Sequence, residues 1–143
     1  MADRTKEELL YLARLAEQCD RFDEMVDYVC NFSKMGEEEL NQDERNILSV
    51  AFKNVVGTKR AAWRVISLIQ KKEIGKGQHQ NAEKAKAYKQ MIEKELTNTC
   101  QMILDLLNDH LLPKTKTDPG KVFLHKMKGD YYRYISEYAS GDQ

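Results

Sequence analysis

Proline, cysteine and long apolar runs are all scarce in this chain of 143 residues, and each scarcity excludes a class of protein. Only two prolines interrupt the chain, so long helices can form without a break. The three cysteines are odd in number, far apart and without histidines at zinc-binding spacing, which argues against a disulfide framework or a structural zinc site. We therefore expect no metal and no cofactor, and we expect Cys19, Cys30 and Cys100 to be reduced, buried thiols.

Membrane and secretion signals are absent from the sequence as well. No apolar segment is long enough and free enough of charge to span a membrane, and none near the N-terminus has the form of a secretion signal. The composition, with 41% apolar and 32% charged residues, is typical of well-solvated helical proteins. A chain of this length fits one ordinary domain. We expect a soluble, cytoplasmic, all-α protein.

Acidic residues are missing from one long internal stretch, although the whole chain balances 23 basic against 23 acidic side chains. Residues 45–72 include no Asp or Glu, and the bases there are Arg45, Lys53, Lys59, Arg60, Arg64, Lys71 and Lys72. Residues 1–44 hold the opposite excess, with 13 acids against five bases. The zero net charge thus hides a basic strip, which favours an anionic partner.

Capping signals and hydrophobic periodicity divide the chain into helices. Thr5 and Glu8 have the spacing of a capping box, and apolar stripes on either side of residues 20–21 predict two short helices. After a break near Gly36, the capping residues 41–44 open a helix that we expect to span 42–72. A second long helix is expected over 81–110, ended by Pro113.

The last helix is expected from Pro119 to about Ser140, with Asp118 as its N-cap and Gly141 closing it. Long helices with short connections must pack antiparallel to bury their apolar stripes, so we predict an antiparallel bundle of long helices. Aromatic and aliphatic side chains at helical spacing are expected to pack in its core, namely Phe52, Val56, Trp63, Tyr131 and Tyr132.

Basic side chains on the long helices have the spacing of an anion site. Lys53 and Arg60 lie seven residues apart, so two helical turns bring them to nearly one face. In the last helix, Asp130 and Glu137 give Arg133 one carboxylate on the turn before it and another on the turn after. Such neighbours can hold a guanidinium group in one orientation.

Tyr134, next to Arg133, adds a neutral hydroxyl donor, and a phosphate dianion is best held by such a donor together with arginine forks and a lysine. The alternative is an ordinary solvated face, which is the usual role of Lys and Arg on helices and which suits Lys59 and Arg64 better. Catalytic patterns are poor, because the three histidines are scattered and neither a nucleophile elbow nor a phosphate-binding glycine loop is present. We expect that the protein is not an enzyme.

Three parts of the chain resemble the 14-3-3 family. The stretch 45–64, RNILSVAFKNVVGTKRAAWR, closely resembles the family signature and is highly specific, and segments 15–25 and 126–134 extend the resemblance over essentially the whole chain. The resemblance implies an all-helical dimeric adaptor in signal transduction. Its amphipathic groove would bind phosphoserine or phosphothreonine segments of client proteins, and binding would clamp, mask or bridge those clients.

The resemblance also implies roles for single residues. Phosphate would be bound by residues that helical spacing had already selected, namely Lys53, Arg60, Arg133 and Tyr134. Other side chains would line the groove around the phosphate, namely Asn46, Ser49, Val50, Phe123 and Lys126. Two carboxylates would orient the basic cluster, namely Asp130 and Glu137.

The resemblance further implies a homodimer or heterodimer, in which the first helix of one subunit packs on the third and fourth helices of the other. The implied interface residues are Leu15, Cys19, Arg21, Glu24, Ala62, Ile66, Ile69, Tyr88, Met91 and Glu95. Arg21 and Glu95 match an intersubunit ion pair of the family. A second pair is missing because Met91 stands where a lysine would face Glu24, and Ala62 stands where some members carry a phosphorylatable serine.

Family members continue for several helices beyond the fifth. Residues 1–143 are therefore expected to form the dimerisation and phosphate-binding part of a single domain whose C-terminal helices are absent. Apolar faces left uncovered in this way predict self-association. The alternative to the adaptor is a dimerisation-only structural fragment with weak or no client binding. A third class, a nucleic-acid or anionic-membrane binder, would use the same basic strip but demands many phosphate contacts and a steep salt dependence. We expect no nucleic-acid partner and no membrane span.

Overall fold

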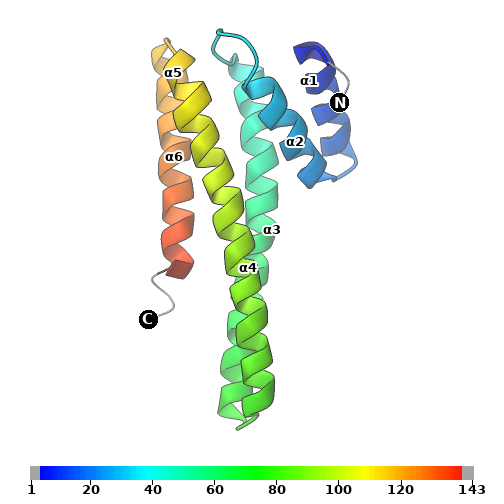
Figure 1. Ribbon diagram of the computed structural model, residues 1–143, viewed down its shortest axis with the longest axis vertical. Coiled ribbons are helices and arrows are strands. Elements are labelled where there is room, and N and C mark those ends of the chain that lie inside the picture. Colours follow the sequence, from blue (N-terminus) through cyan, green and yellow to red (C-terminus); the bar gives the residue numbers. More distant parts are fainter. Residues whose placement is uncertain (1–3, 140–143) are drawn as a thin grey trace.

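The computed structural model describes residues 4–139, and all regular secondary structure in this range is helical, which confirms the predicted all-α class (Figure 1). In chain order the elements are α1 (Lys6–Gln18), α2 (Phe22–Ser33), α3 (Gln42–Gly75), α4 (His79–Leu106), η1 (Leu107–Leu111), α5 (Leu112–Lys114) and α6 (Asp118–Ala139). The segments α4, η1 and α5 follow one another without a break. None of the helices described in this range is long and apolar enough to cross a membrane.

Two helices begin with the capping boxes that the sequence predicts. The Thr5 hydroxyl accepts from the backbone of Glu8 at 3.1 Å, and the Glu8 carboxylate accepts from the backbone of Thr5 at 3.1 Å. Asn41 and Glu44 exchange the same two hydrogen bonds at 2.9 Å at the start of α3. Because a capping box satisfies backbone N–H groups that have no partner within the helix, it fixes where α1 and α3 begin.

The end of the fourth helix was predicted wrongly. The chain stays helical through Pro113 to Lys114, and it does so by way of the π-helical turn η1. A proline has no N–H to donate, and its ring displaces the carbonyl group four residues earlier. The wider π turn just before Pro113 accommodates both effects, so the helix changes pitch instead of ending.

The start of α6 also differs from the prediction. The helix begins at Asp118, and the capping group is the Thr117 hydroxyl, which accepts from the N–H of Gly120 at 3.2 Å. The Glu39 carboxylate holds this corner from the α2–α3 loop, since it accepts from the N–H of Lys116 at 2.9 Å and from the Thr117 N–H at 3.0 Å and O–H at 2.7 Å. The predicted closure of the last helix at Ser140 and Gly141 lies outside the described residues.

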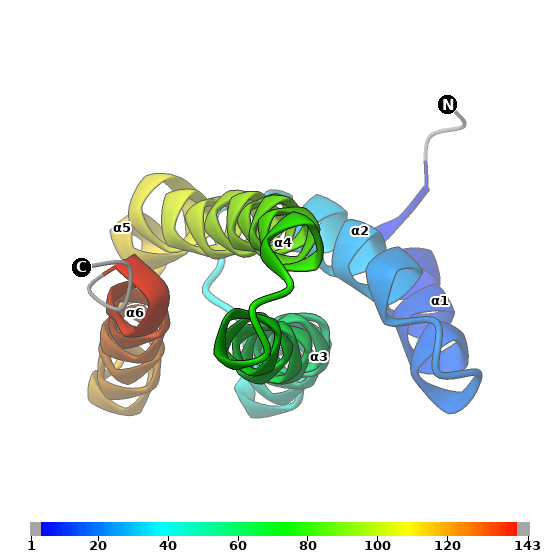
Figure 2. The same ribbon diagram turned by 90° about the horizontal axis from the view of Figure 1, so that it is seen from below.

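The long helix α3 lies in the middle of the bundle, with α1 and α2 on one side of the α3–α4 pair and α6 on the other (Figure 2). Fully buried side chains from α2, α3 and α4 fill the space between the helices, among them Val29, Phe32, Leu48, Phe52 and Ile103. Phe52 and Val56 are thus core residues as predicted. Beyond this core, the α3–α4 hairpin extends past the ends of α1, α2 and α6 (Figure 1).

Four of the predicted buried side chains are not fully buried in the core, and one of them, Cys30, is half-buried. Cys19 is exposed because it caps the C-terminus of α1, and Tyr132 is 51% exposed while its neighbour Tyr131 is buried. Trp63 is only half-buried, and its indole N–H donates to the Glu93 carboxylate at 2.8 Å. Cys100 is buried as predicted, and burial raises the pKa of its thiol to about 11.

Candidate anion-binding site

A cavity of about 280 Å³ lies between α3 and α6. Its lining residues are Ser49, Lys53, Phe123, Lys126, Met127, Asp130, Tyr131, Arg133 and Tyr134. Two of the four predicted phosphate ligands on its rim, Arg133 and Tyr134, come from α6, and one, Lys53, comes from α3. Because α3 and α6 pack side by side, residues about 80 positions apart in the sequence meet at one opening.

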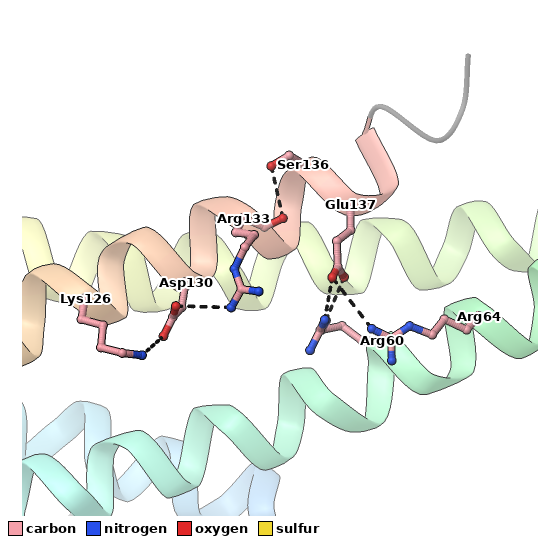
Figure 3. Close-up of polar contacts among 7 residues, drawn as sticks. All are labelled: Arg60, Arg64, Lys126, Asp130, Arg133, Ser136 and Glu137. Carbon is pink, nitrogen blue, oxygen red and sulfur yellow. Dashed lines mark hydrogen bonds and ion pairs between the residues drawn. The ribbon is translucent and has the colours of Figure 1, made fainter.

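The charged side chains of the cavity carry a positive excess. Lys53, Lys126 and Arg133 are basic, and the only acid among the lining residues is Asp130. The Asp130 carboxylate binds the ammonium group of Lys126 at 3.1 Å and the guanidinium group of Arg133 at 3.3 Å (Figure 3). Asp130 therefore draws two cations of α6 toward one point, while the side chain of Arg133 remains 63% exposed.

Arg60 lies beside this cavity but is held by another carboxylate. Its guanidinium group donates two hydrogen bonds to Glu137, at 2.9 Å and 2.6 Å, and Arg64 approaches the same carboxylate at 3.8 Å (Figure 3). These hydrogen bonds lower the pKa of Glu137 and raise that of Arg60. Only 20% of the Arg60 side chain is exposed, so this arginine is less available than Arg133.

The ring of Tyr134 connects the two arginines. The guanidinium carbon of Arg60 lies 4.1 Å from the ring centroid, and that of Arg133 lies 5.1 Å from it. The same ring packs edge-on against Tyr131 at 5.2 Å, which in turn packs edge-on against Phe52 of the core at 6.4 Å. An aromatic face attracts a cation, so Tyr134 holds both guanidinium groups against a support that reaches the core.

Spacing along α6 alone gave Glu137 a different partner. It placed the carboxylate next to Arg133, but among the described contacts Glu137 pairs with Arg60 and Arg64 of α3. Arg133 keeps only Asp130 as an ion-pair partner within residues 4–139. Glu137 is therefore a link between two helices, which a reading of one helix does not reveal.

The groove residues implied by the resemblance divide into two groups. Ser49, Phe123 and Lys126 line the cavity, whereas Asn46 is exposed outside it and Val50 is half-buried against the core. Two cavity residues were missed, Met127 and Tyr131. Tyr131 stands three residues before Tyr134 on α6, and that helical spacing was the available signal.

Most of the implied dimer residues are accessible in the single chain. Leu15 is 38% exposed, Ile69 42%, Met91 47% and Tyr88 55%, while Ile66 is half-buried, and Cys19 and Ala62 are exposed. The charged members of the set have partners within the chain. Arg21 pairs with Glu24 three residues later, which raises the pKa of Arg21 and lowers that of Glu24. Glu95 accepts from Lys59 at 3.2 Å.

Comparison with known proteins gives one consistent family. A family model described as 14-3-3 protein matches residues 12–143. The chain is 48% identical to 14-3-3 protein 7 of Solanum lycopersicum over 140 residues, which cover 98% of this chain and 55% of the relative. It is 47% identical to a 14-3-3-like protein of Chlamydomonas reinhardtii over 137 residues, which cover 95% of this chain and 53% of the relative. The chain thus spans about half the length of the curated relatives it matches, and it belongs to the 14-3-3 family.

Proposed function

We propose that this protein is a phosphoserine- and phosphothreonine-dependent adaptor, which binds phosphorylated client proteins as a dimer and regulates them by clamping, masking or bridging. Membership of the 14-3-3 family supports an adaptor role. The observation that carries the phosphate specificity is the cavity between α3 and α6. We place the activity in the cytoplasm and propose that it involves no catalysis.

The charge of the cavity suits a phosphorylated side chain. Lys53, Lys126 and Arg133 bring three positive charges, and Asp130 removes one, which leaves two. A phosphoserine or phosphothreonine brings about −1.5 to −2 charges and three strong acceptor oxygens. In this arrangement Arg133 supplies a planar fork, Lys53 a point charge and Tyr134 a neutral hydroxyl donor.

Selection against the unmodified residue follows from the same charges. A plain serine hydroxyl entering the cavity displaces water from Lys53 and Arg133 without returning a negative charge, so that the cations lose solvation and gain no partner. Arg60 completes the site in this proposal, because its guanidinium carbon lies 4.1 Å from the centroid of the Tyr134 ring, which lines the cavity. Glu137 holds it there in the absence of client.

Dimerisation would let one adaptor engage two phosphorylated segments. Exposed apolar side chains on α1, α3 and α4 are available for the contact, among them Leu15, Ile69 and Tyr88. Sedimentation at micromolar concentration tests this part, and we expect an associated species. A strictly monomeric profile would contradict it.

Titration calorimetry with one peptide in phosphorylated and plain forms tests the function itself. We expect heat and saturation with the phosphorylated peptide and neither with the plain peptide. A peptide carrying glutamate in place of the phosphoserine is the charge control and should bind far more weakly, because it has one charge and two acceptor oxygens. Absent or equal heats for the phosphorylated and plain forms would favour the dimerisation-only alternative.

A further inference from the structure

The far end of the α3–α4 hairpin is a surface of its own. It projects beyond α1, α2 and α6, so no other described helix packs around it (Figure 1). The turn Lys76–Gln78 joins the end of α3 to the start of α4, and no other described helix lies beside this turn. The cavities found among the described residues lie elsewhere, beside α6 or beside η1. The hairpin end is thus convex and accessible.

Lysines dominate this end. Residues 71–89 hold six lysines against two acids, Glu73 and Glu83, a net charge of +4 over 19 residues. Five of these lysines form no ion pair within the described chain, and all five are exposed: Lys71, Lys72, Lys76, Lys84 and Lys86. The lysines here thus differ from the cations in and beside the cavity between α3 and α6, most of which pair with a carboxylate. We call the five lysines the lysine tip.

Large aliphatic side chains are exposed among the same lysines. Leu68 is 68% exposed, Val65 56% and Ile74 54%. Val65, Leu68 and Lys72 stand at i, i+3 and i+7 of α3, so the two aliphatic residues and a lysine share one stripe. The residues implied for dimerisation on α3 are others, Ala62, Ile66 and Ile69. The implied dimer contact therefore does not include Leu68 and Ile74, and a partner that covers them must bind at another contact.

We infer that the lysine tip, together with Leu68 and Ile74, binds the surface of anionic lipid membranes. Ammonium groups on long side chains attract an anionic lipid surface, and aliphatic side chains can enter the boundary between headgroups and acyl chains. A convex end suits a flat, fluid surface, whereas a peptide partner is normally held in a groove. A nucleic acid would use the lysines but offers nothing to bury Leu68 and Ile74.

Co-sedimentation with vesicles tests the inference on the whole chain. The probe is phosphatidylcholine vesicles with and without about one third phosphatidylserine, at low and at physiological ionic strength. We expect binding to the anionic vesicles only, weakened by salt. Each lysine near such a surface is worth about fivefold in affinity, so the triple variant Lys71→Gln, Lys72→Gln, Lys76→Gln should lose about a hundredfold.

A second triple variant is the matched control. Lys116→Gln, Lys121→Gln, Lys128→Gln removes the same charge from α6 and the segment before it, away from the lysine tip, and should leave vesicle binding within about twofold. The double variant Leu68→Ser, Ile74→Ser should weaken binding severalfold without changing its salt dependence, because it removes apolar contact and no charge. Phosphopeptide affinity should be the same in the tip variants as in the parent chain, which also shows that they fold.

Several outcomes would overturn the inference. Equal binding to neutral vesicles would remove the role of the lysines, and equal losses in the two lysine variants would show attraction by total charge only. An unchanged affinity in the Leu68 and Ile74 variant would remove the apolar contact. Tighter binding to duplex DNA than to vesicles, lost in the tip variant, would identify a nucleic-acid surface instead.

Discussion

The middle and the far end of α3 carry similar basic residues in opposite surroundings. Near its middle, Arg60 is held by the Glu137 carboxylate of α6, and the neighbouring cavity contains Asp130 between two further cations. At its far end, Lys71 and Lys72 are exposed and have no ion-pair partner among residues 4–139. The difference arises because α6 packs against one part of α3 and does not reach the other (Figure 1).

This contrast shows what turns a basic strip into a specific site. Carboxylates of α6 fix the directions of the guanidinium groups of Arg60 and Arg133, and an aromatic ring supports them, so a small anion meets groups that are already placed. Mobile lysines on a convex end meet any anionic surface that is large enough. The sign of the charge is the same in both regions, so in the two proposals above the supporting residues decide the class of partner.

The largest expected effect is the loss of phosphopeptide binding in Arg133→Ala. Two charge-assisted hydrogen bonds to a phosphate are worth about 3–6 kcal/mol together, so the affinity should fall at least about a hundredfold while helicity stays unchanged. Arg60→Ala should also abolish binding, although its guanidinium group is directed at Glu137 in the free chain. Calorimetry and circular dichroism measure the two quantities.

Arg64→Ala is the matched control for these two variants. Arg64 lies on α3, as Arg60 does, and approaches the same Glu137 carboxylate at 3.8 Å, but among the described contacts it does not pack on the Tyr134 ring of the cavity as Arg60 does. Its removal should change the affinity by less than about threefold, as expected for an exposed ion pair. Similar losses in the Arg64 and Arg133 variants would show that only the overall charge matters, and the contrast between the middle and the far end of α3 would disappear.

The next effect concerns the docking of α6, on which the cavity depends and the lysine tip does not. A Cβ atom added at Gly120 would lie 2.6 Å from the Glu39 carboxylate, 2.8 Å from the Thr115 methyl group and 2.9 Å from the Thr117 hydroxyl. Glu39 cannot move away without breaking the hydrogen bonds that hold the start of α6. Gly120→Ala should lower the free energy of unfolding by about 1–3 kcal/mol in denaturant titrations.

Gly129→Ala on the same helix is the control for this substitution. A Cβ atom there meets nothing within 4 Å, so the variant should gain up to about 1 kcal/mol from the higher helix propensity of alanine. Vesicle binding should be unaffected in both variants. Equal stability of the two variants would mean that the corner formed by Glu39 and Thr117 does not hold α6.

Local signals explain most of what the sequence predicted about the fold. The capping boxes at Thr5 and Asn41 are exchanges between residues three apart, and the apolar stripes repeat within each helix, so both can be read without knowing the packing. The seven-residue spacing of Lys53 and Arg60 is local in the same sense. These features gave the helix order and the side of α3 on which the candidate site lies.

Contacts between distant segments account for the errors. Glu137 pairs with Arg60 across 77 positions, a partner that its spacing from Arg133 on α6 did not reveal. The start of α6 depends on Glu39, which lies 78 positions before Thr117. Tyr131 reaches the cavity because α6 packs beside Phe52 of α3. The contacts of Glu137 with Arg60 and of Glu39 with Thr117 leave no periodic signal in the sequence, because each depends on how two distant segments are placed.

The smallest expected effect is the pH dependence of phosphopeptide binding, which separates titration of the ligand from titration of the site. Arg60 lowers the pKa of Glu137 below its ordinary value of about 4.5, so the stabilisation from this ion pair is complete above pH 4.5 and is lost only as the pH falls through the lowered value. The pair therefore stays charged between pH 5.5 and 7.5.

A phosphoserine has a second pKa of about 6, so its dianion falls to about one quarter at pH 5.5, and the affinity should fall about fourfold. Calorimetry at both pH values should give the same ratio in Glu137→Gln, because that side chain does not titrate in this range. A much larger ratio in the parent chain, reduced by this substitution, would show that Glu137 gains a proton near neutral pH and that its pairing with Arg60 is weaker than the geometry indicates.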